Sequence, residues 1–234
     1  MKNLLVIIAA AIIFSSCHGI RGSGNIKSEH RTINQFEGVL AGGSIDVEIK
    51  NSGNPGVEVE ADDNVLPYIV TDVKNGLLEV NYKTGMYFHN THAKVYVTAS
   101  SLKKLYSSGS SDISAMQGIE NDEMIDVRVS GSGNVNAQVK APNIRAAVSG
   151  SGNLVLQGRT KNFDCTVSGS GNAKCQELLS ENTNIDVGGS GNANVYASVS
   201  LKASAGGSGD IYYRGNPSTP EIHRSGSGSV QPEK

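Results

Sequence analysis

The motif Ser-Gly-Ser-Gly-Asn recurs along the second half of the chain at a nearly constant spacing, and this repeat restricts the fold more than any other feature. The first glycine of each Gly-Ser-Gly falls at Gly131, Gly150, Gly169, Gly189, Gly207 and Gly226, and the diverged segment SSGSSD places Gly109 in the same role. The successive steps from Gly109 are 22, 19, 19, 20, 18 and 19 residues. Apolar or small residues alternate with polar ones on both sides of each motif, which is typical of two short β-strands joined by a tight turn. The repeat therefore predicts one turn and two strands in every unit.

The alternation also predicts which side chains point inward. The inward positions before each motif are Val127, Val129, Ala146, Val148, Cys165, Val167, Ile185, Val187, Ala203 and Ala205, and those after it are Val135, Ala137, Leu154, Leu156, Ala173, Cys175, Ala193, Val195, Ile211 and Tyr213. A unit this short cannot bury its own apolar face, so each strand must pair in parallel with its equivalent one unit away. We expect an all-β fold, a single-stranded, right-handed parallel β-helix with coils of about 19 residues in the C-terminal half.

The polar residues of the motif would stack in columns at the turns. One column contains Asn134, Asn153, Asn172 and Asn192, and another contains Ser132, Ser151, Ser170, Ser190 and Ser208. We expect both to be structural ladders whose amides and hydroxyls bond from coil to coil, while glycine supplies the backbone angles of the turn. Calcium-binding β-rolls are the alternative, but they repeat every nine residues and require an aspartate at each turn.

Residues 26–106 contain alternating segments but are less regular. Gly43, Gly76 and Gly109 lie 33 residues apart and each precedes an alternating run, which predicts wider coils with insertions of about fourteen residues. A short helix is expected within residues 62–70, and strands are expected at VEVEA and HAKVYVTA. The wider coils would cover one end of the stack, which an open solenoid requires for solubility.

The N-terminus, MKNLLVIIAAAIIFSSC, has the layout of a secretory signal peptide, and its apolar run is too short to span a bilayer. Small residues directly before a cysteine resemble the lipobox of bacterial lipoproteins, in which the cysteine becomes the first mature residue and carries the lipids. We expect Cys17 to be lipidated, the alternative being an ordinary signal peptide with an incidental cysteine. The expected organisation is a signal peptide (1–16), a lipidated cysteine with a flexible tether (17–25), an irregular β-rich part (26–106), the SGSGN β-helix (107–229) and a tail (230–234).

The amino-acid composition gives no indication of a nucleic acid partner. The 20 Lys and Arg residues are balanced by 22 Asp and Glu residues, which leaves a net charge of −2 without a polybasic run. The chain has no Trp and only four Phe residues but 28 glycines, which favours a stack of small side chains over a core of large aromatic ones.

The sequence lacks the common catalytic motifs G-x-S-x-G, H-E-x-x-H and G-x-x-x-x-G-K. Polysaccharide-degrading enzymes on β-helices gather carboxylates and basic residues on one outer face. The outward columns expected here do not do so: one contains Arg128, Ala147, Thr166, Asp186 and Ser204, and the other Asn136, Val155, Lys174, Asn194 and Tyr212. We therefore expect a non-catalytic protein without a cofactor, and keep a polysaccharide lyase or hydrolase as the alternative.

The segment TGMYFHNTHAK is the best candidate for contact with a partner. Met86, Tyr87 and Phe88 bring three large apolar groups together between two strands, where binding residues are often found. The competing interpretation, which we favour, is that they cap the apolar end of the stack. His89 and His92 lie in the same segment, but no third ligand is near in sequence, so no metal site is expected.

Cys165 and Cys175 point inward on strands that flank the turn of one coil. They could bridge across the core or sit as small buried hydrophobic residues. We expect free thiols, because neighbouring coils place Ala, Leu, Ile and Val at the equivalent positions.

Four segments taken in order, RTINQFEGVLAGGSIDVEI, VEVEADDNVLPYIVTDVKNGLLEVNY, KVYVTASSLKKLYSSGSSDI and the iterated SGSGN, resemble the bacterial family described as "putative auto-transporter adhesin, head GIN domain", which is common in Bacteroidetes lipoproteins. The resemblance covers about residues 26–229 and implies a β-helix-like fold and a cell-envelope location, without agreed catalytic residues. Together with Cys17 it implies an outer-membrane lipoprotein whose partners are the membrane and a glycan or an envelope protein. The absence of acidic residues between Cys17 and Glu29 favours the periplasmic face.

Overall fold

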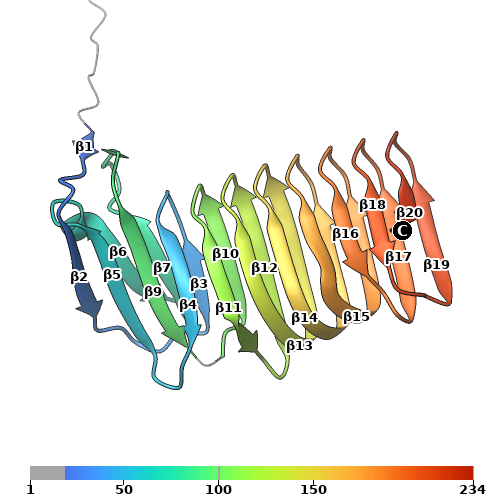
Figure 1. Cartoon of the computed structure of the whole chain (residues 1–234), viewed down its shortest axis with the longest axis horizontal. Coiled ribbons are helices and arrows are strands. Elements are labelled where there is room, and N and C mark those ends of the chain that lie inside the picture. Colours follow the sequence, from blue (N-terminus) through green and yellow to red (C-terminus); the bar gives the residue numbers. More distant parts are fainter. Residues whose placement is uncertain (1–18, 100, 234) are drawn as a thin grey trace, which may run out of the picture.

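The computed structural model describes residues 19–99 and 101–233, and this part of the chain is almost entirely β-structure, with 64% strand and 1% helix. About seven turns stack along one axis, with equivalent positions about 19 residues apart (Figure 1). The predicted all-β parallel β-helix is therefore confirmed. The 3-10 helix η1 (Leu66–Tyr68) lies within the segment predicted to contain a helix. Within the described residues, no helix has the length and apolar character needed to cross a bilayer.

Two parallel sheets face each other across the core, and each turn contributes to both. Along the stack, the first sheet contains β7 (Leu77–Tyr82), β3 (Gly38–Ala41), β10 (Lys104–Gly109), β12 (Met124–Gly131), the second halves of β13 (Val135–Gly150), β14 (Leu154–Val167) and β15 (Ala173–Val187), then β17 (Ser200–Ala205) and β19 (Thr219–Arg224). The second sheet contains β9 (Ala93–Ala99), β4 (Asp46–Asn51), β11 (Ile113–Glu120), the first halves of β13, β14 and β15, then β16 (Ala193–Tyr196), β18 (Ile211–Arg214) and β20 (Val230–Pro232). In the middle of the stack, one bent strand thus runs from each SGSGN turn to the next.

The strands pair in the register that the alternation predicts. Val129 pairs with Val148, Val148 with Val167, and Val167 with Val187, and none of the four exposes more than 1% of its surface. Every predicted inward position is buried except Tyr213, which is partly buried. Because burying a valine side chain contributes about 1.5–3 kcal/mol, these columns of small residues supply much of the stability of the stack.

Gly43, Gly76 and Gly109 do not mark three equivalent turns of the N-terminal part, as their spacing predicted. Gly43 and Gly109 stack directly, and a Cβ atom on Gly109 would lie 2.6 Å from the Gly43 carbonyl oxygen. Gly76 instead forms, with Asn75, the tight turn between β6 (Ile69–Lys74) and β7, where the two residues have φ of 73° and 52°. The spacing of 33 residues was misleading because a two-residue hairpin turn selects glycine for its backbone angles.

The first turns of the stack are not in sequence order. The turn β3–β4 lies between the turn β7–β9 and the turn β10–β11, both of which follow it in the sequence (Figure 1). Accordingly, β3 pairs with β7 and β10, and β4 pairs with β9 and β11. The chain therefore leaves the stack after β4, builds the end of the solenoid, and returns on the other side of β3–β4.

Antiparallel strands close the N-terminal end of the stack. β5 (Gly56–Asp62) pairs with β9 and with β2 (Ile26–Arg31), and β6 pairs with β7. Val59 on β5, Ile69 on β6 and Val65 between these strands are at most 2% exposed. The outer strand β2 carries charged side chains, which discourage edge-to-edge pairing with another chain. The irregular part thus covers one end of the stack, as predicted.

Cys165 and Cys175 are both buried, and both are free thiols, so the prediction for this pair is confirmed. Burial raises the pKa of both thiols, to about 12 for Cys175. They belong to the core, where the neighbouring turns place aliphatic side chains.

Candidate functional site

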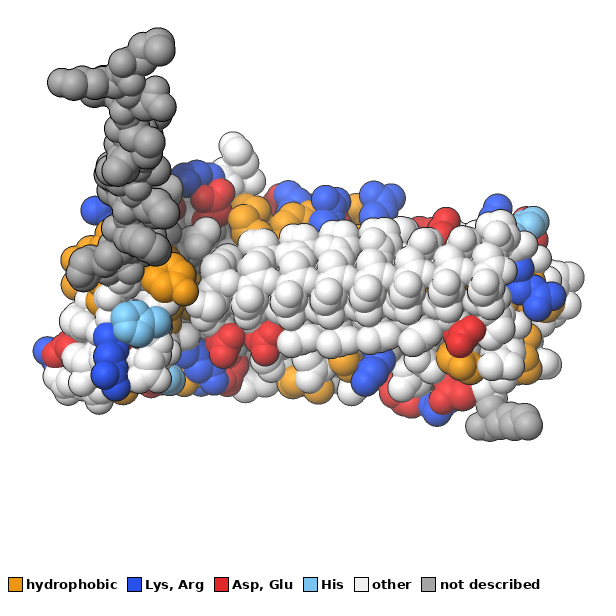
Figure 2. Space-filling model, turned by 90° about the horizontal axis from the view of Figure 1, so that it is seen from above, with side chains coloured by type: hydrophobic (Ala, Val, Ile, Leu, Met, Phe, Trp, Pro, Cys, Tyr) orange, Lys and Arg blue, Asp and Glu red, His pale blue; other side chains and the backbone are white. Residues whose placement is uncertain are grey.

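The SGSGN turns form a continuous ridge along the upper edge of the solenoid in Figure 1, which we call the turn ridge. Figure 2 shows it as an uncoloured band of backbone and uncharged polar side chains. The Oδ1 atom of Asn134 accepts hydrogen bonds from the backbone N–H and the Nδ2 atom of Asn153, each at 3.0 Å. The Nδ2 atoms of Asn172 and Asn192 continue this column at 2.9 and 3.4 Å. The asparagines of successive turns are therefore linked side chain to side chain.

Aspartate replaces asparagine at both ends of the column. Asp112 accepts hydrogen bonds from Asn134, and the backbone N–H of Asp210 donates to Asn192 at 2.9 Å. The Asp210 carboxylate accepts hydrogen bonds from Ser229, which lower its pKa. A carboxylate supplies the accepting oxygen of the column but not the donating amide, so aspartate fits only where the donor is not needed.

The serine column differs from the predicted hydroxyl ladder. The side chains of Ser132, Ser151, Ser170 and Ser190 are exposed, and their backbone N–H groups donate at 2.7–2.9 Å to a glycine carbonyl of the neighbouring turn. The hydroxyls form a row that faces solvent at the strand spacing of about 4.8 Å. Such a row can offer evenly spaced donors and acceptors to a partner.

Lack of space is the main reason for glycine in the turn ridge. A Cβ atom on Gly152 or Gly171 would collide with the backbone carbonyl of the glycine one turn earlier, although neither residue has a positive φ. A positive φ adds to the requirement at Gly131, where φ is 122°. The prediction from backbone angles therefore explains only part of the glycine pattern.

Residues 83–92 form the enlarged turn that joins β7 to β9 at the N-terminal end of the upper edge, and we call this segment the aromatic loop. Phe88 stacks on Tyr82 with ring centroids 4.3 Å apart and lies 5.8 Å from the ring of Tyr68, so it belongs to the end cap. Met86 and Tyr87 are 37% and 65% exposed. The capping interpretation thus holds for Phe88, whereas Met86 and Tyr87 face solvent.

The two histidines of the aromatic loop contact different groups. The Nε2 atom of His92 lies 2.8 Å from the Oε1 atom of Glu60, and the His92 backbone N–H donates to Asp62 at 2.7 Å. His89 lies against Gly19, since a Cβ atom on Gly19 would be 2.8 Å from the His89 Nδ1 atom. Across residues 19–99 and 101–233, no group of three or more His, Cys, Asp or Glu side chains is placed to hold a metal ion.

The expected tether after Cys17 is docked onto the body from its third residue, Ile20. Strand β1 (Ile20–Arg21) pairs in parallel with β8 (Phe88–His89) of the aromatic loop. The Ser23 hydroxyl donates to Asp63 at 2.7 Å, and this bond contributes to lowering the pKa of Asp63. Residues 20–25, which were predicted to be flexible, are therefore held against the body. Cys17 itself, the predicted lipidation site, lies outside the described residues.

A second asparagine column, which the sequence analysis did not predict, runs along the lower edge, where the strands bend. The Nδ2 atom of Asn162 donates to Asn143 at 2.9 Å, and that of Asn182 donates to Asn162 at 3.1 Å. The Ser200 hydroxyl continues the column at 2.8 Å. These residues recur at the same interval as the turn motif, so their spacing was a usable signal, although no glycine accompanies them.

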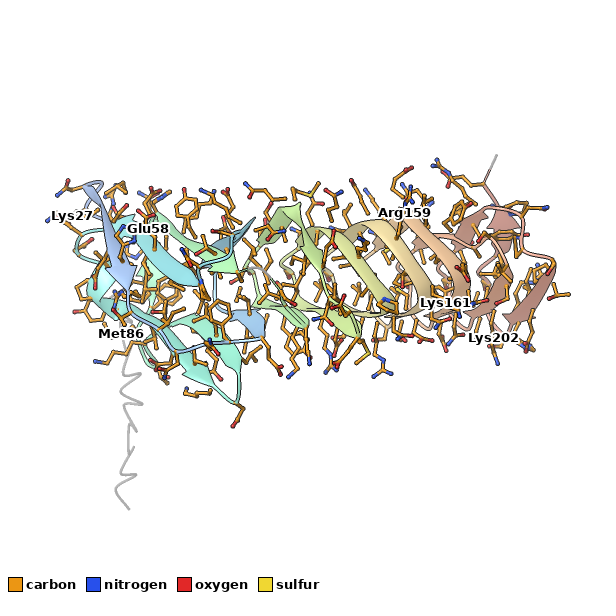
Figure 3. All side chains as sticks on the ribbon, turned by 90° about the horizontal axis from the view of Figure 1, so that it is seen from below. Lys27, Glu58, Met86, Arg159, Lys161 and Lys202 are labelled. Atoms are coloured by element: carbon orange, nitrogen blue, oxygen red, sulfur yellow. The ribbon has the colours of Figure 1, made fainter. Side chains whose placement is uncertain are left out.

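A groove of about 600 Å³, which we call the lower groove, lies at the same lower edge. The bends of successive turns line it, and its side chains include Glu120 and Lys140, then Arg159 and Lys161, then Leu179 and Tyr196. Figure 3 looks onto this edge and labels Arg159 and Lys161. A hollow of about 410 Å³ shares Glu120, Lys140 and Arg159 and extends the groove along the second sheet.

Two cationic side chains of the lower groove have no carboxylate partner. Lys140 pairs with Glu120 at 3.0 Å, whereas Arg159 and Lys161 have no carboxylate oxygen within 4.0 Å in the described part of the chain. Leu179, which also lines the groove, is 42% exposed. The backbone carbonyl of Tyr196 accepts hydrogen bonds from the hydroxyls of Ser180 and Thr183, which hold this residue in place. Free positive charge next to aromatic and aliphatic surface suits a ligand with both an anionic group and an apolar face.

On the outer face of the first sheet, several of the charged side chains pair with another charge. The charge alternates along one column, through Lys104, Asp126, Arg145, Asp164, Asn184, Lys202 and Glu221. The Tyr106 hydroxyl donates to Asp126 at 2.8 Å, and Arg128 pairs with the same carboxylate. Burial and the bond to Asp126 raise the pKa of Tyr106 to about 12. These contacts stabilise the sheet, although the exposed Arg145 has no carboxylate oxygen within 4.0 Å in the described part of the chain.

Comparison with known proteins agrees with this architecture. A family model described as "Putative auto-transporter adhesin, head GIN domain" matches residues 35–217. The chain belongs to this family. The resemblance predicted from the sequence is thereby confirmed, and the GIN-domain model spans both the irregular cap and nearly all of the SGSGN repeats. Among curated proteins we find no match.

Crystal structures of proteins from Bacteroides and Parabacteroides share the GIN-domain fold. A protein of Bacteroides fragilis described as a "putative adhesin" superposes with a TM-score of 0.88 at 22% identity, over 92% of this chain and 100% of its own. Two proteins of Parabacteroides distasonis, described as a "putative lipid binding protein" and a "putative adhesin", superpose with TM-scores of 0.72 and 0.70 at 26% and 25% identity. Each match covers 92% of this chain and at least 99% of the other.

Proposed function

We propose that this protein is a non-catalytic binding module of the cell envelope, held at the outer membrane by lipids on Cys17 and facing the periplasm. The names of the family and of its structural relatives, which refer to adhesins and to lipid binding, support a binding role. The lipobox-like sequence before Cys17 supports the anchor.

The single observation that carries the binding role is the lower groove. Its volume of about 600 Å³ lies within the range of ligand sites in proteins. Arg159 and Lys161 would hold a carboxylate or sulfate group, while Tyr196 and Leu179 would contact the apolar face of a sugar ring. We propose an acidic glycan as the ligand. Its acidic group would contact Arg159 and Lys161, and its hydroxyl groups would donate to the carboxylates of Asp122 and Glu181, which also line the groove.

Calorimetric titration of the chain with acidic and neutral glycans tests this ligand. The double variant Arg159→Gln with Lys161→Gln should weaken binding of an acidic glycan at least about tenfold, equivalent to about 1.4 kcal/mol. Lys202→Gln is the control, because Lys202 is an exposed cation on β17 that does not line the lower groove and pairs with Glu221 at 3.7 Å (Figure 3). An equal loss in the control would contradict a specific site. Binding of an envelope protein instead of any glycan would contradict the ligand class.

A polysaccharide-degrading enzyme is the competing function, because Glu120, Asp122 and Glu181 also line the lower groove. Glycosidases use paired carboxylates, one of which must stay protonated as a general acid. All three carboxylates here are exposed, and Glu120 is paired with Lys140, so none of them lies in the apolar pocket typical of a glycosidase general acid. Glycan turnover that is lost in Asp122→Asn or Glu181→Gln would overturn the non-catalytic proposal.

The anchor is tested separately by replacing the cysteine. The Cys17→Ala variant should leave the membrane fraction of the cell and appear in the soluble fraction. If it still fractionates with membranes, the lipid anchor is wrong. Protease treatment of intact cells then decides the side, because a protein on the periplasmic face should survive it.

A further inference from the structure

The aromatic loop is tied to the segment that leads back to Cys17. The backbone N–H of Ile20 donates to the carbonyl of Tyr87 at 2.8 Å, and Ile20 pairs with Phe88. Gly19 packs against the ring of Tyr87, since a Cβ atom on Gly19 would lie 2.8 Å from the Tyr87 Cδ1 atom. The chain that follows Cys17 therefore joins the body at this loop and is fixed there by backbone hydrogen bonds.

Covalent geometry limits the distance between Cys17 and the aromatic loop. Three residue steps separate Cys17 from Ile20, and a fully extended chain covers at most about 11 Å in three steps. The polar layer on each side of a bilayer is about 5–8 Å thick. Acyl chains on Cys17 would therefore bring the aromatic loop to the headgroup layer.

The side chains of the aromatic loop have the chemistry of a membrane interface. Tyr87 and Met86 are exposed, although Phe88 beside them is packed into the cap. Tyrosine is favoured at the headgroup level because one end of its side chain is apolar and the other is polar. Arg21 and Lys83 flank the pair, are exposed, and have no carboxylate oxygen within 4.0 Å in the described part of the chain. Unpaired cations next to an apolar tip fit anionic headgroups.

We propose that Met86 and Tyr87 sit in the headgroup layer of the membrane that carries the lipids of Cys17, with Arg21 and Lys83 on anionic headgroups. This inference rests on the lipid anchor proposed above. The aromatic loop lies at the N-terminal end of the upper edge, whereas the lower groove lies on the opposite edge (Figures 1 and 3). Contact through the loop therefore leaves the lower groove accessible on the side away from the bilayer.

Tryptophan fluorescence tests the contact without background, because the chain contains no tryptophan. The full lipidated chain carrying Tyr87→Trp is reconstituted into vesicles of phosphatidylethanolamine and phosphatidylglycerol with brominated acyl chains, which quench nearby tryptophan. Val199→Trp is the matched control, because Val199 is 49% exposed and directly follows the lower-groove residue Ser198. Circular dichroism verifies that both variants are folded, and flotation verifies that both are anchored.

The expected result is a loss of Tyr87→Trp emission in brominated vesicles relative to unbrominated ones, with unchanged emission of Val199→Trp. Adding Arg21→Gln and Lys83→Gln should reduce this quenching, and so should omitting phosphatidylglycerol. Anchored protein with no quenching at position 87 overturns the loop contact but leaves the lipid anchor intact. Quenching at both positions overturns the proposed orientation. Protein that does not float overturns the anchor and with it this inference.

Discussion

The backbone carbonyl of Gly152 occupies the place where the side chain of Gly171 would begin. The same relation links Gly133 to Gly152, and Gly171 to Gly191, so each turn of the ridge is built against the backbone of its neighbour. Any side chain at these positions would force apart strands that must stay about 4.8 Å from each other to remain paired. The glycine column therefore sets the closest approach of the turns.

We expect Gly171→Ala to lower the free energy of unfolding by about 3 kcal/mol, because the added methyl group overlaps backbone atoms that cannot move independently. Gly188→Ala is the matched control, since no atom lies within 4 Å of a Cβ at that position and its φ is not positive. The control should stay within about 0.5 kcal/mol of the parent. Urea unfolding measures both, and equal losses would contradict the packing argument.

The asparagine column of the turn ridge predicts opposite pH behaviour for two substitutions at Asn153. Asn153→Ala removes hydrogen bonds to Asn134 and Asn172 and should cost about 1–2 kcal/mol at any pH. Asn153→Asp places a carboxylate oxygen against the Asn134 Oδ1 atom, which should raise the pKa of the new carboxyl in the folded state. The protonated carboxyl of this variant can donate to Asn134, so the variant is most stable at acidic pH. This stability is lost as the pH rises through the folded-state pKa. Unfolding measured between pH 3 and 7 should show the Asp variant recovering only in acid, and a pH-independent loss would contradict this.

Cys165 and Cys175 should resist alkylation in the native protein, because both are buried and burial raises the pKa of each thiol. Only the thiolate reacts, so native protein at pH 8 should remain unmodified. Mass spectrometry after denaturation in a thiol-blocking reagent should then find both cysteines blocked. If neither is blocked, the two residues form a disulfide and the assignment as free thiols is wrong.

Tyr106 should make the protein sensitive to strongly alkaline pH. Its pKa is raised from 10.0 to about 12 by burial and by the bond to Asp126. The contribution of the protonated Tyr106 to the free energy of unfolding is fully present below pH 10. It is lost as the pH rises from 10 to 12, because in this range the phenol is deprotonated in the unfolded chain before it is deprotonated in the folded protein. Tyr106→Phe should be less stable than the parent at pH 8, and the difference should shrink toward pH 12. A difference that stays constant in guanidinium unfolding would contradict the assignment.

The repetitive half of the fold was predictable because a single spacing determines it. Once Val129, Val148 and Val167 are aligned on the following glycine, parallel stacking fixes their burial and their partners. The lower asparagine column follows the same spacing and was equally predictable in principle. It was not predicted, because Asn143, Asn162 and Asn182 lie at bends without glycine.

The irregular half could not be predicted in the same way. The spacing of Gly43, Gly76 and Gly109 did not distinguish a hairpin turn from a turn of the stack, since both select glycine. The lower groove depends on irregular pairing, where β11 and β15 shift register against their neighbours near the bends. Beyond the shift between β14 and β15, Arg159 pairs with Leu179, and no local sequence pattern predicts this contact.

During folding, the strands β3 and β4 cannot pair until later parts of the chain are available, because both turns that flank them come later in the sequence. Contacts between this turn and β10–β11 join residues about 66 apart, whereas contacts in the SGSGN half join residues 18 to 22 apart. Closing the longer loop costs more entropy and slows folding. We therefore expect the SGSGN half, whose contacts are short in sequence, to form first and to act as the seed to which the N-terminal turns are added.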